Sequence, residues 1–328
     1  MKALLATCFF IFLALADTSA QDPLFSQYNA SPLFVNPAFA GTSQIKRLSL
    51  CYRNQNPAMG SSYVSYYASY DQYVELFQGG IGFNILHDVQ ENGMLRLLSA
   101  DAIYAYSIMV SPKLTVSAGI QASYSYRMLQ AASLHFTDGV DPVDGSYLPQ
   151  KDNLMDEHKG YPDVAVGFLG ITRFSYLGFA AHHLNKPNMS FQPSRRMPLP
   201  WKLTLHGGTI LPLYERRFGR EALRLNPNIV LTYQGGHSQF NYGLDIWAGS
   251  LYVGLWGRQH LPLTVSSVVV TGGYSGDWFR VGYSYDFSIL SSYMAMMNSG
   301  AHEFSFSLKL NRESSQRMKR KTIKFPIF

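Results

Sequence analysis

The stretch LTVSAGIQASYSYR, which runs from Leu114 to Arg127, decides the fold class of this chain. Apolar or aromatic side chains fill every second position, and small or polar side chains fill the positions between them. Successive side chains of a β-strand point to opposite faces, so this alternation predicts a strand with one apolar and one polar face. Strands usually have about 5–6 residues, whereas about 9–11 are needed to cross a bilayer. The stretch is therefore predicted to span a membrane.

The same alternation recurs along the chain, for example at 238–248, 277–287 and 301–310. Runs of this kind predict strands at 46–55, 61–71, 79–88, 95–110, 113–128, 162–173, 174–183, 201–212, 223–235, 238–248, 249–258, 265–276, 277–287 and 301–310. Single-chain bacterial barrels have an even number of strands, and this set of about 14 satisfies that rule. The predicted fold class is all-β: a transmembrane antiparallel β-barrel of about 14 strands with an N-terminal plug-like segment.

The composition favours the same class. Charged residues make up 15% of the chain and aromatic residues 14%. Soluble domains average about 25% charged residues, so the deficit points to a membrane protein. Beyond the first twenty residues, no apolar run is long enough for a spanning helix. Only Cys51 remains after that stretch, which excludes an internal disulfide, and we expect no nucleic-acid partner for an exported chain.

The chain divides into four predicted parts. Residues 1–20 have the features of a signal peptide: Lys2, an apolar run, and small residues before a cleavage site at Gln21. Residues 21–45 are irregular because of their X-Pro steps, and they either enter the lumen as a plug or remain a loose periplasmic leader. Residues 46–311 form the barrel, and 312–328 form a basic tail. The candidate plug residues are Phe25, Tyr28, Asn36 and Pro37.

The predicted connections differ in length between the two ends of the barrel. The longest ones, at 129–161, 184–200 and 288–300, all leave from the same end. Outer-membrane barrels have short periplasmic turns and longer external loops. The chain is therefore predicted to be a multi-pass protein of the outer membrane with both termini in the periplasm.

The polar faces of the predicted strands give a candidate lumenal set. Its charges have both signs, which predicts ion pairs across a packed interior, since buried charges need partners. The alternative is a polar pore or a socket for a segment of a partner. The candidate residues are Arg53, Arg127, Asp245, Arg258, Arg280, Asp286 and Glu303, with Asp101, Gln121, Asn228, Gln234 and Lys309 on the same faces.

The longest connection is the best candidate for an outward binding surface, because binding residues concentrate on long loops. Its acidic residues include Asp138, Asp141, Asp144, Asp152 and Asp156. Spaced carboxylates can bind Ca²⁺, but the spacing departs from the twelve-residue loop of helix-loop-helix sites, and Pro142 interrupts it. We therefore predict a solvated loop and no cofactor.

No credible catalytic set stands out. His237-Ser238 has no orienting carboxylate nearby in sequence, so an enzyme is not predicted. His182 and His183 lie where a predicted strand reaches the outer rim. Adjacent residues of a strand point to opposite faces and chelate a metal poorly, so both are expected to be rim histidines.

Several motifs resemble those of the PorP/SprF family, and they follow one another along nearly the whole chain. They are Asp22-Pro23-Leu24-Phe25-Ser26-Gln27-Tyr28, Asn36-Pro37-Ala38-Phe39-Ala40-Gly41, Tyr52-Arg53-Asn54-Gln55, Gly79-Gly80-Ile81-Gly82, Pro162-Asp163, His183-Leu184-Asn185-Lys186-Pro187, Gly282-Tyr283-Ser284-Tyr285-Asp286 and Ser299-Gly300-Ala301-His302-Glu303. The family belongs to the type IX secretion and gliding apparatus.

The resemblance implies a non-enzymatic outer-membrane barrel. Such a barrel helps to export, or anchors at the cell surface, a large secreted protein with a type IX C-terminal sorting domain. Its partners would be that protein, periplasmic or outer-membrane components of the apparatus, and the lipid bilayer. Asn36-Pro37-Ala38 also resembles the hatch of fatty-acid transport barrels. A transporter for hydrophobic small molecules is therefore the alternative.

Overall fold

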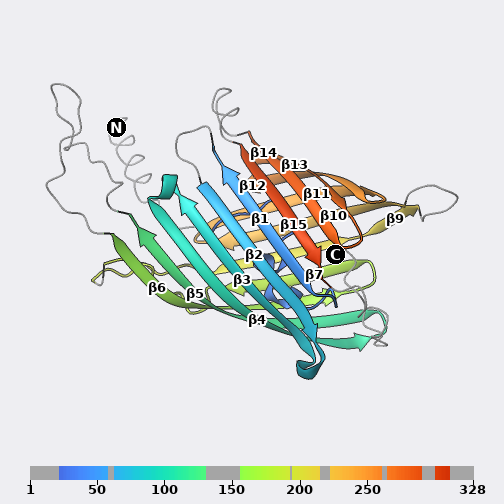
Figure 1. The fold of residues 1–328 in the computed structure, drawn as a ribbon, viewed down its shortest axis with the longest axis horizontal. Helices are drawn as coiled ribbons and strands as arrows, with labels where there is room; N and C mark the ends of the chain where they lie inside the picture. Colours follow the sequence, from blue (N-terminus) through green and yellow to red (C-terminus); the bar gives the residue numbers. More distant parts are fainter. Residues whose placement is uncertain are drawn as a thin grey trace, which may run out of the picture.

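The computed structural model describes residues 22–57, 63–130, 156–192, 194–214, 222–260, 264–289 and 300–310. Its strands form one antiparallel sheet that closes into a barrel (Figure 1). In chain order the strands are β1 (Arg47–Gln55), β2 (Tyr63–Val74), β3 (Gly79–Gln90), β4 (Leu95–Ser111), β5 (Leu114–Leu129), β6 (Glu157–Ile171), β7 (Ser175–His182), β8 (Lys202–Thr209), β9 (Leu211–Tyr214), β10 (Leu223–Gln234), β11 (His237–Ala248), β12 (Leu251–His260), β13 (Thr264–Ser275), β14 (Phe279–Ser288) and β15 (Ala301–Lys309).

The wall closes without a free edge strand. β15 pairs with β1, so that Lys309 faces Arg47 and Ala301 faces Gln55. β8 and β9 pair with β10 one after the other, and Ile210 separates them, so the two fill a single position in the wall. The wall therefore has fourteen positions, which confirms the predicted antiparallel barrel of about 14 strands.

The two faces of the strands differ as the alternation predicts. In β5, Ile120 and Tyr124 are each 59% exposed on the outer surface, whereas Ser117 and Gln121 are buried on the inner face. Large exposed apolar side chains of this kind recur on the outer face of the other strands. A continuous apolar outer surface is stable in hydrocarbon and unfavourable in water. The barrel is therefore a transmembrane one.

The connections define two ends of the barrel. Those at 56–62, 91–94, 130–156, 183–201, 235–236, 261–263 and 289–300 leave from one end, which we call the loop end. Those at 75–78, 112–113, 172–174, 215–222, 249–250 and 276–278 leave from the other, which we call the turn end. The two-residue connection at the loop end is Gly235-Gly236, with φ angles of 57° and 84°. Glycine adopts this left-handed conformation without strain, and it matches the twist of the strands.

The helices are single turns. In the N-terminal part, α2 (Pro32–Val35) and η1 (Pro37–Phe39) each begin with proline. Proline has no backbone N–H, and it is favoured at this position because an N–H in the first turn would have no acceptor within the helix. The turns η2 (Glu75–Phe77) and η3 (Glu91–Gly93) lie in connections. Within the described residues, no helix is both long and apolar enough to cross a membrane.

Residues 22–46, which we call the N-terminal segment, run through the interior from the loop end to the turn end. Asp22 contacts His183 and Gln234 at the loop end, and Gly41 donates to Asp71 near the turn end, where the segment leads into β1. Leu310, the last described residue, lies at the turn end against Lys46. The described part of the chain thus begins at the loop end and stops at the turn end, because the segment traverses the whole length of the barrel. The placement of both termini in the periplasm stays a prediction.

A charged residue in the middle of the outer face should block assembly. Replacing Ile120 with arginine is expected to cost about 2–4 kcal/mol, because the guanidinium would face hydrocarbon at mid-strand. The measurement is the fraction of protein that runs as a folded, heat-modifiable band on a gel after refolding into lipid. Ile120→Leu is the matched control, and equal yields for the two variants would contradict the assigned outer face.

Candidate functional site

The N-terminal segment touches the wall with its backbone, and glycines make this approach possible. The carbonyl of Ala40 lies so close to Gly80 of β3 that any Cβ at that position would overlap it. A Cβ on Gly119 of β5 would stand 2.5 Å from the backbone nitrogen of Ala38, and Ser117 donates to the carbonyl of the same residue. Glycine is required at such close approaches because it has no side chain.

An apolar cluster lies in the half of the interior near the turn end. The segment contributes Leu33, Ala38, Phe39 and Ala40 to a buried cluster with wall residues Ile103, Ala105, Leu169, Ile171 and Ile210. The alternation of the strands predicted polar side chains on the inner face. Inward apolar side chains occur here because the segment brings a second apolar surface, and burying a Leu or Phe stabilises the packing by roughly 1.5–3 kcal/mol each.

The half of the interior near the loop end is held by a charged cluster, which we call the Glu303 clamp (Arg53, Arg258, Asp286 and Glu303). Both carboxylate oxygens of Glu303 accept backbone N–H groups of the segment, from Ser26 at 2.7 Å and from Gln27 at 2.9 Å. Arg53 forms ion pairs with Glu303 at 3.0 Å and with Asp286 at 2.8 Å. Arg258 pairs with Asp286 at 3.0 Å. Four residues of the predicted lumenal set thus meet in one cluster.

The clamp is balanced in charge, and three of its side chains converge on the hydroxyl of Ser26. The Ser26 hydroxyl donates to Asp286 and accepts from Arg53 and Arg258, each at 2.8 Å. Glu303 is fully buried. A buried ion pair adds little net stability, but removing one partner leaves an unpaired buried charge and costs about 3–5 kcal/mol. The clamp therefore fixes the register of the segment in the barrel.

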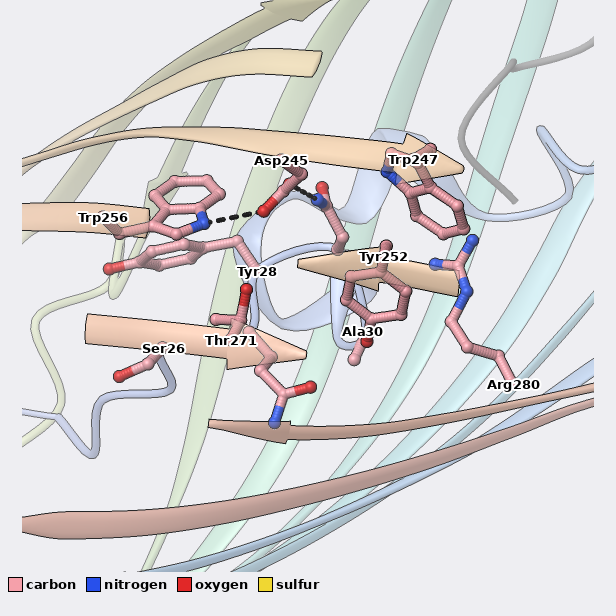
Figure 2. Close-up of a pocket in the computed structure, with 11 residues that line it drawn as sticks. Ser26, Tyr28, Ala30, Asp245, Trp247, Tyr252, Trp256, Thr271 and Arg280 are labelled. Carbon is pink, nitrogen blue, oxygen red and sulfur yellow. Dashed lines mark hydrogen bonds between the residues drawn. The ribbon is translucent and has the colours of Figure 1, made fainter. Parts of the chain in front are cut away.

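A second contact lies deeper, at a pocket of about 20 Å³ between the segment and β11 to β14 (Figure 2). Asp245 accepts from the indole N–H of Trp256 at 3.0 Å and from the side chain of Asn29 at 3.1 Å. The ring of Tyr28 packs against Trp256, with centroids 5.7 Å apart. On the other side of the pocket, the guanidinium of Arg280 lies 4.8 Å from the centre of the Trp247 ring. Asp245 and Arg280, both predicted lumenal residues, thus line the same pocket.

Asn36 anchors the middle of the segment. Its side-chain N–H₂ reaches the carbonyls of Phe168 and Phe179 at 3.0 and 3.2 Å, and Nε2 of His206 lies 3.0 Å away. Its Oδ1 accepts from the backbone of Ala38 at 2.8 Å and so caps the 3-10 turn that begins at Pro37. All four candidate plug residues lie in the interior: Phe25, Asn36 and Pro37 are buried, and Tyr28 is half-buried.

The start of the segment is fixed by a third cluster at the loop end, which we call the His183 bridge (Asp22, Asp163, His183 and Lys202). His183 Nδ1 lies 2.7 Å from Asp163, and its Nε2 lies 2.9 Å from Asp22. Lys202 Nζ lies 3.1 Å from the same oxygen of Asp22. An imidazole that faces a carboxylate with each nitrogen can donate to both only as the doubly protonated cation.

The expectation of two rim histidines is wrong: the structure buries both His182 and His183. The strand β7 ends at His182, and His183 takes a left-handed backbone conformation with φ of 61°. Because His183 has left the strand, the alternation of faces no longer applies, and both rings line the same interior cavity.

The charges of the His183 bridge predict a pH dependence. Burial by itself lowers the pKa of His183, but the carboxylates of Asp22 and Asp163 outweigh it and raise that pKa to about 9. The pKa of Asp22 is held well below its usual range, because His183 and Lys202 outweigh the effect of burial. The stabilisation by His183 is therefore complete below about pH 6.5 and is lost as the pH rises through about 9.

Raising the pH from 7 to 10 is accordingly expected to loosen the start of the N-terminal segment, by at most roughly 3 kcal/mol. A spin label on Leu24→Cys, in a Cys51→Ala background, should become more mobile across this range. His183→Gln should show the mobile line shape at pH 7 already and no further change. An immobile label at pH 10 would contradict the bridge.

The remaining candidates lie outside these clusters. Arg127 is half-buried near the loop end, where its guanidinium lies 3.3 Å from the sulfur of Met189. Asp156 is exposed just before β6, whereas Asp138, Asp141, Asp144 and Asp152 lie outside the described residues, so the prediction of a solvated loop there stays a prediction. His237 and Ser238 are neighbours at the start of β11 and so point to opposite faces. Within the described residues, no group of three or more His, Cys, Asp or Glu could hold a metal.

The comparisons with known proteins give one family and several similar folds. The family model described as type IX secretion system membrane protein PorP/SprF matches residues 17–308. Among curated proteins, none matches this sequence. The chain is similar in structure to the CymD monoaromatic hydrocarbon channel, with a TM-score of 0.46 and 12% identity over 86% of this chain and 93% of that one.

Two further structures are similar at the same level. The toluene transporter TodX of Pseudomonas putida has a TM-score of 0.45 and 12% identity, over 89% of this chain and 95% of that one. A FadL homologue of Pseudomonas aeruginosa has a TM-score of 0.45 and 11% identity, over 86% and 94%. Similarities of this size carry no information on what the chain binds.

Proposed function

Because the chain belongs to the PorP/SprF family of type IX secretion system membrane proteins, we propose that it is an outer-membrane barrel that holds an exported protein at its loop end. The exported protein is a large chain with a type IX C-terminal sorting domain, which the barrel helps to export or anchors at the cell surface. In this proposal the loop end faces the cell exterior, and the protein is not an enzyme.

The observation that carries the proposal is the filled interior. The N-terminal segment runs the length of the barrel and is fixed by the Glu303 clamp and the His183 bridge. The described cavities beside it are small, of about 20 and 70 Å³, and a vestibule of about 240 Å³ opens at the loop end. An interior occupied in this way favours a role in holding a partner over passing a large chain through the lumen.

The described part of the loop end offers an apolar surface for a partner. The connection 183–201 exposes Leu184, Met197 and Trp201, and the ammonium of Lys186 lies 4.2 Å from the centre of the Trp201 ring. Exposed tryptophans flanked by cations are frequent anchors of protein interfaces. The acidic residues of the longest connection, Asp138 to Asp156, are proposed to extend this surface.

The test is co-purification from detergent-solubilised outer membranes after mild crosslinking. The expected result is recovery of an exported protein with a sorting domain, reduced severalfold by Trp201→Ala. Trp278→Ala is the matched control, because Trp278 is at least as exposed as Trp201 but lies at the turn end. A barrel recovered without any exported partner, or an equal loss from both variants, would refute the proposal.

One feature of the wall favours the second candidate, a transport barrel for hydrophobic small molecules. β6 pairs with β7 only from Val166 to Ile171. Closer to the loop end, β6 is hydrogen-bonded instead by residues 183–185, which follow β7. A short ladder is a place where the wall could part towards the bilayer. This candidate predicts that mass spectrometry finds lipid or hydrocarbon retained by the purified barrel and no exported partner.

A further inference from the structure

A polar cavity of about 70 Å³ lies at the loop end, between the start of the N-terminal segment and the inner face of the wall. One row of directly paired residues crosses four neighbouring strands beneath it: Asn84, Asp101, Ser123 and Asp163. Paired residues of a sheet share one face, so these side chains point into the same space. The volume has room for several waters or for one ammonium group with a water.

The cavity is lined by acceptors that lack donors. Asn84 Oδ1, Gln121 Oε1 and Asp163 Oδ1 are buried and have no hydrogen-bond partner within the described residues. Each of the two amides donates one hydrogen bond inside this row of residues, Asn84 to Asp101 at 3.5 Å and Gln121 to Ser123 at 3.1 Å, which turns its oxygen away from these partners. Buried polar atoms rarely lack a hydrogen-bond partner, so each unsatisfied one indicates that a donor or acceptor binds there. All three of these need a donor.

The charges around the cavity leave one carboxylate over. Asp22 and Asp163 are paired with His183 and Lys202 in the His183 bridge. Asp101 also lines the cavity, but it is hydrogen-bonded to neutral groups: the hydroxyl of Ser99 at 2.9 Å and the amide of Asn84 at 3.5 Å. With His183 doubly protonated, three carboxylates face two cations. One positive charge completes the balance.

We propose that this cavity binds a primary ammonium group beside Asp101. An ammonium has three N–H donors and no acceptor, which matches a carboxylate flanked by the free oxygens of Asn84, Gln121 and Asp163. The group belongs to a free amine or to a lysine side chain of a polypeptide, since the two share this chemistry. A multivalent metal fits less well, because the described residues hold no metal-binding group of three or more His, Cys, Asp or Glu. The proposal is independent of the function proposed above.

The test is the thermal midpoint of the full barrel in detergent, measured at pH 7 and constant chloride with four cations. n-Butylammonium represents a free amine, and N-acetyl-lysine amide represents a lysine side chain. Tetramethylammonium carries the charge without N–H donors, and sodium is the reference. A saturating rise of the midpoint by a few degrees is expected with either of the first two and not with the last two. A rise with only one of them supports the site and identifies the source.

Two variants locate the site. Asp101→Asn should abolish the ammonium-dependent rise, and Gln121→Leu should weaken binding about tenfold without changing the charge. Asp88→Asn is the matched control, because Asp88 is a buried carboxylate on the neighbouring strand β3 and lies outside this cavity. The proposal is overturned if no cation changes the midpoint, if tetramethylammonium or sodium acts as strongly, or if the effect survives in Asp101→Asn. Should Asp101→Asn not fold, the Gln121→Leu result decides.

Discussion

Replacing Glu303 with glutamine is expected to release the part of the N-terminal segment that lies near the loop end. A glutamine has one acceptor oxygen where the carboxylate has two, so either Ser26 or Gln27 would lose its backbone hydrogen bond. In this variant Asp286 would be the one carboxylate left in the clamp for Arg53 and Arg258, so one buried positive charge would be unpaired. We expect a loss of about 3–5 kcal/mol in the attachment of the segment.

The measurement is thiol labelling of Ala30→Cys in a Cys51→Ala background at constant pH. Ala30 is buried, so labelling requires release of the segment. Each 1.4 kcal/mol changes an equilibrium about tenfold, so the labelling rate should rise on the order of a hundredfold or more. Asp88→Asn serves as the control, because Asp88 bonds Ser65 and Gln90 and does not touch the segment. The strand ladder should remain intact, as a heat-modifiable band on a gel would report.

Charge balance can be separated from hydrogen bonding with a double variant. Arg53→Met together with Glu303→Gln leaves Arg258 and Asp286 as a neutral pair. The effects of substitutions at contacting residues on the free energy are not additive. Because the double variant leaves no unpaired charge in the clamp, it should label more slowly than Arg53→Met alone. A labelling rate for Glu303→Gln equal to that of the control would show that the segment is held elsewhere.

The wall of the barrel could be predicted from the sequence because its cause is local. Alternation within one strand fixes which side chains face lipid, and the predicted strand at 113–128 corresponds closely to β5. The lumenal residues follow from the same alternation, so Arg53, Asp286 and Glu303 were predicted on the inner face. Their convergence on one clamp could not be predicted, because it depends on which strands become neighbours when the barrel closes.

The path of the N-terminal segment lay beyond sequence reasoning for the same reason. Its contacts join residues far apart in the chain, such as Ser26 with Glu303 and Asp22 with His183. Irregular segments have no periodicity that could reveal such partners. The signals that existed were the motifs of the family resemblance. Ser26-Gln27 of the segment belongs to them, and so do wall residues that contact the segment or one of its anchors: Arg53, Gly80, Asp163, His183, Asp286 and Glu303.

Removing the N-terminal segment is expected to turn the barrel into an open pore. The ladder of fourteen wall positions does not include this segment, so a chain that lacks residues 24–44 can still close its sheet. About fourteen strands enclose a lumen too wide for wall side chains to fill. The apolar cluster around Ile103, Leu169 and Ile171 would become wet, which costs stability but leaves the backbone hydrogen bonds of the strands in place.

Planar-bilayer recording provides the measurement: the intact chain should show little current, and the shortened chain a steady, ohmic one. Gly119→Leu tests the same idea without a deletion, because a side chain there would push Ala38 off the wall. Gly170→Leu is its control, since a Cβ at Gly170 meets only ordinary contacts. We expect current from Gly119→Leu and not from Gly170→Leu.

If the shortened barrel is folded and still closed, the segment does not close the lumen. The connection 183–201 then becomes the element to remove next, because it packs Met189 and Leu199 against Tyr161 at the loop end.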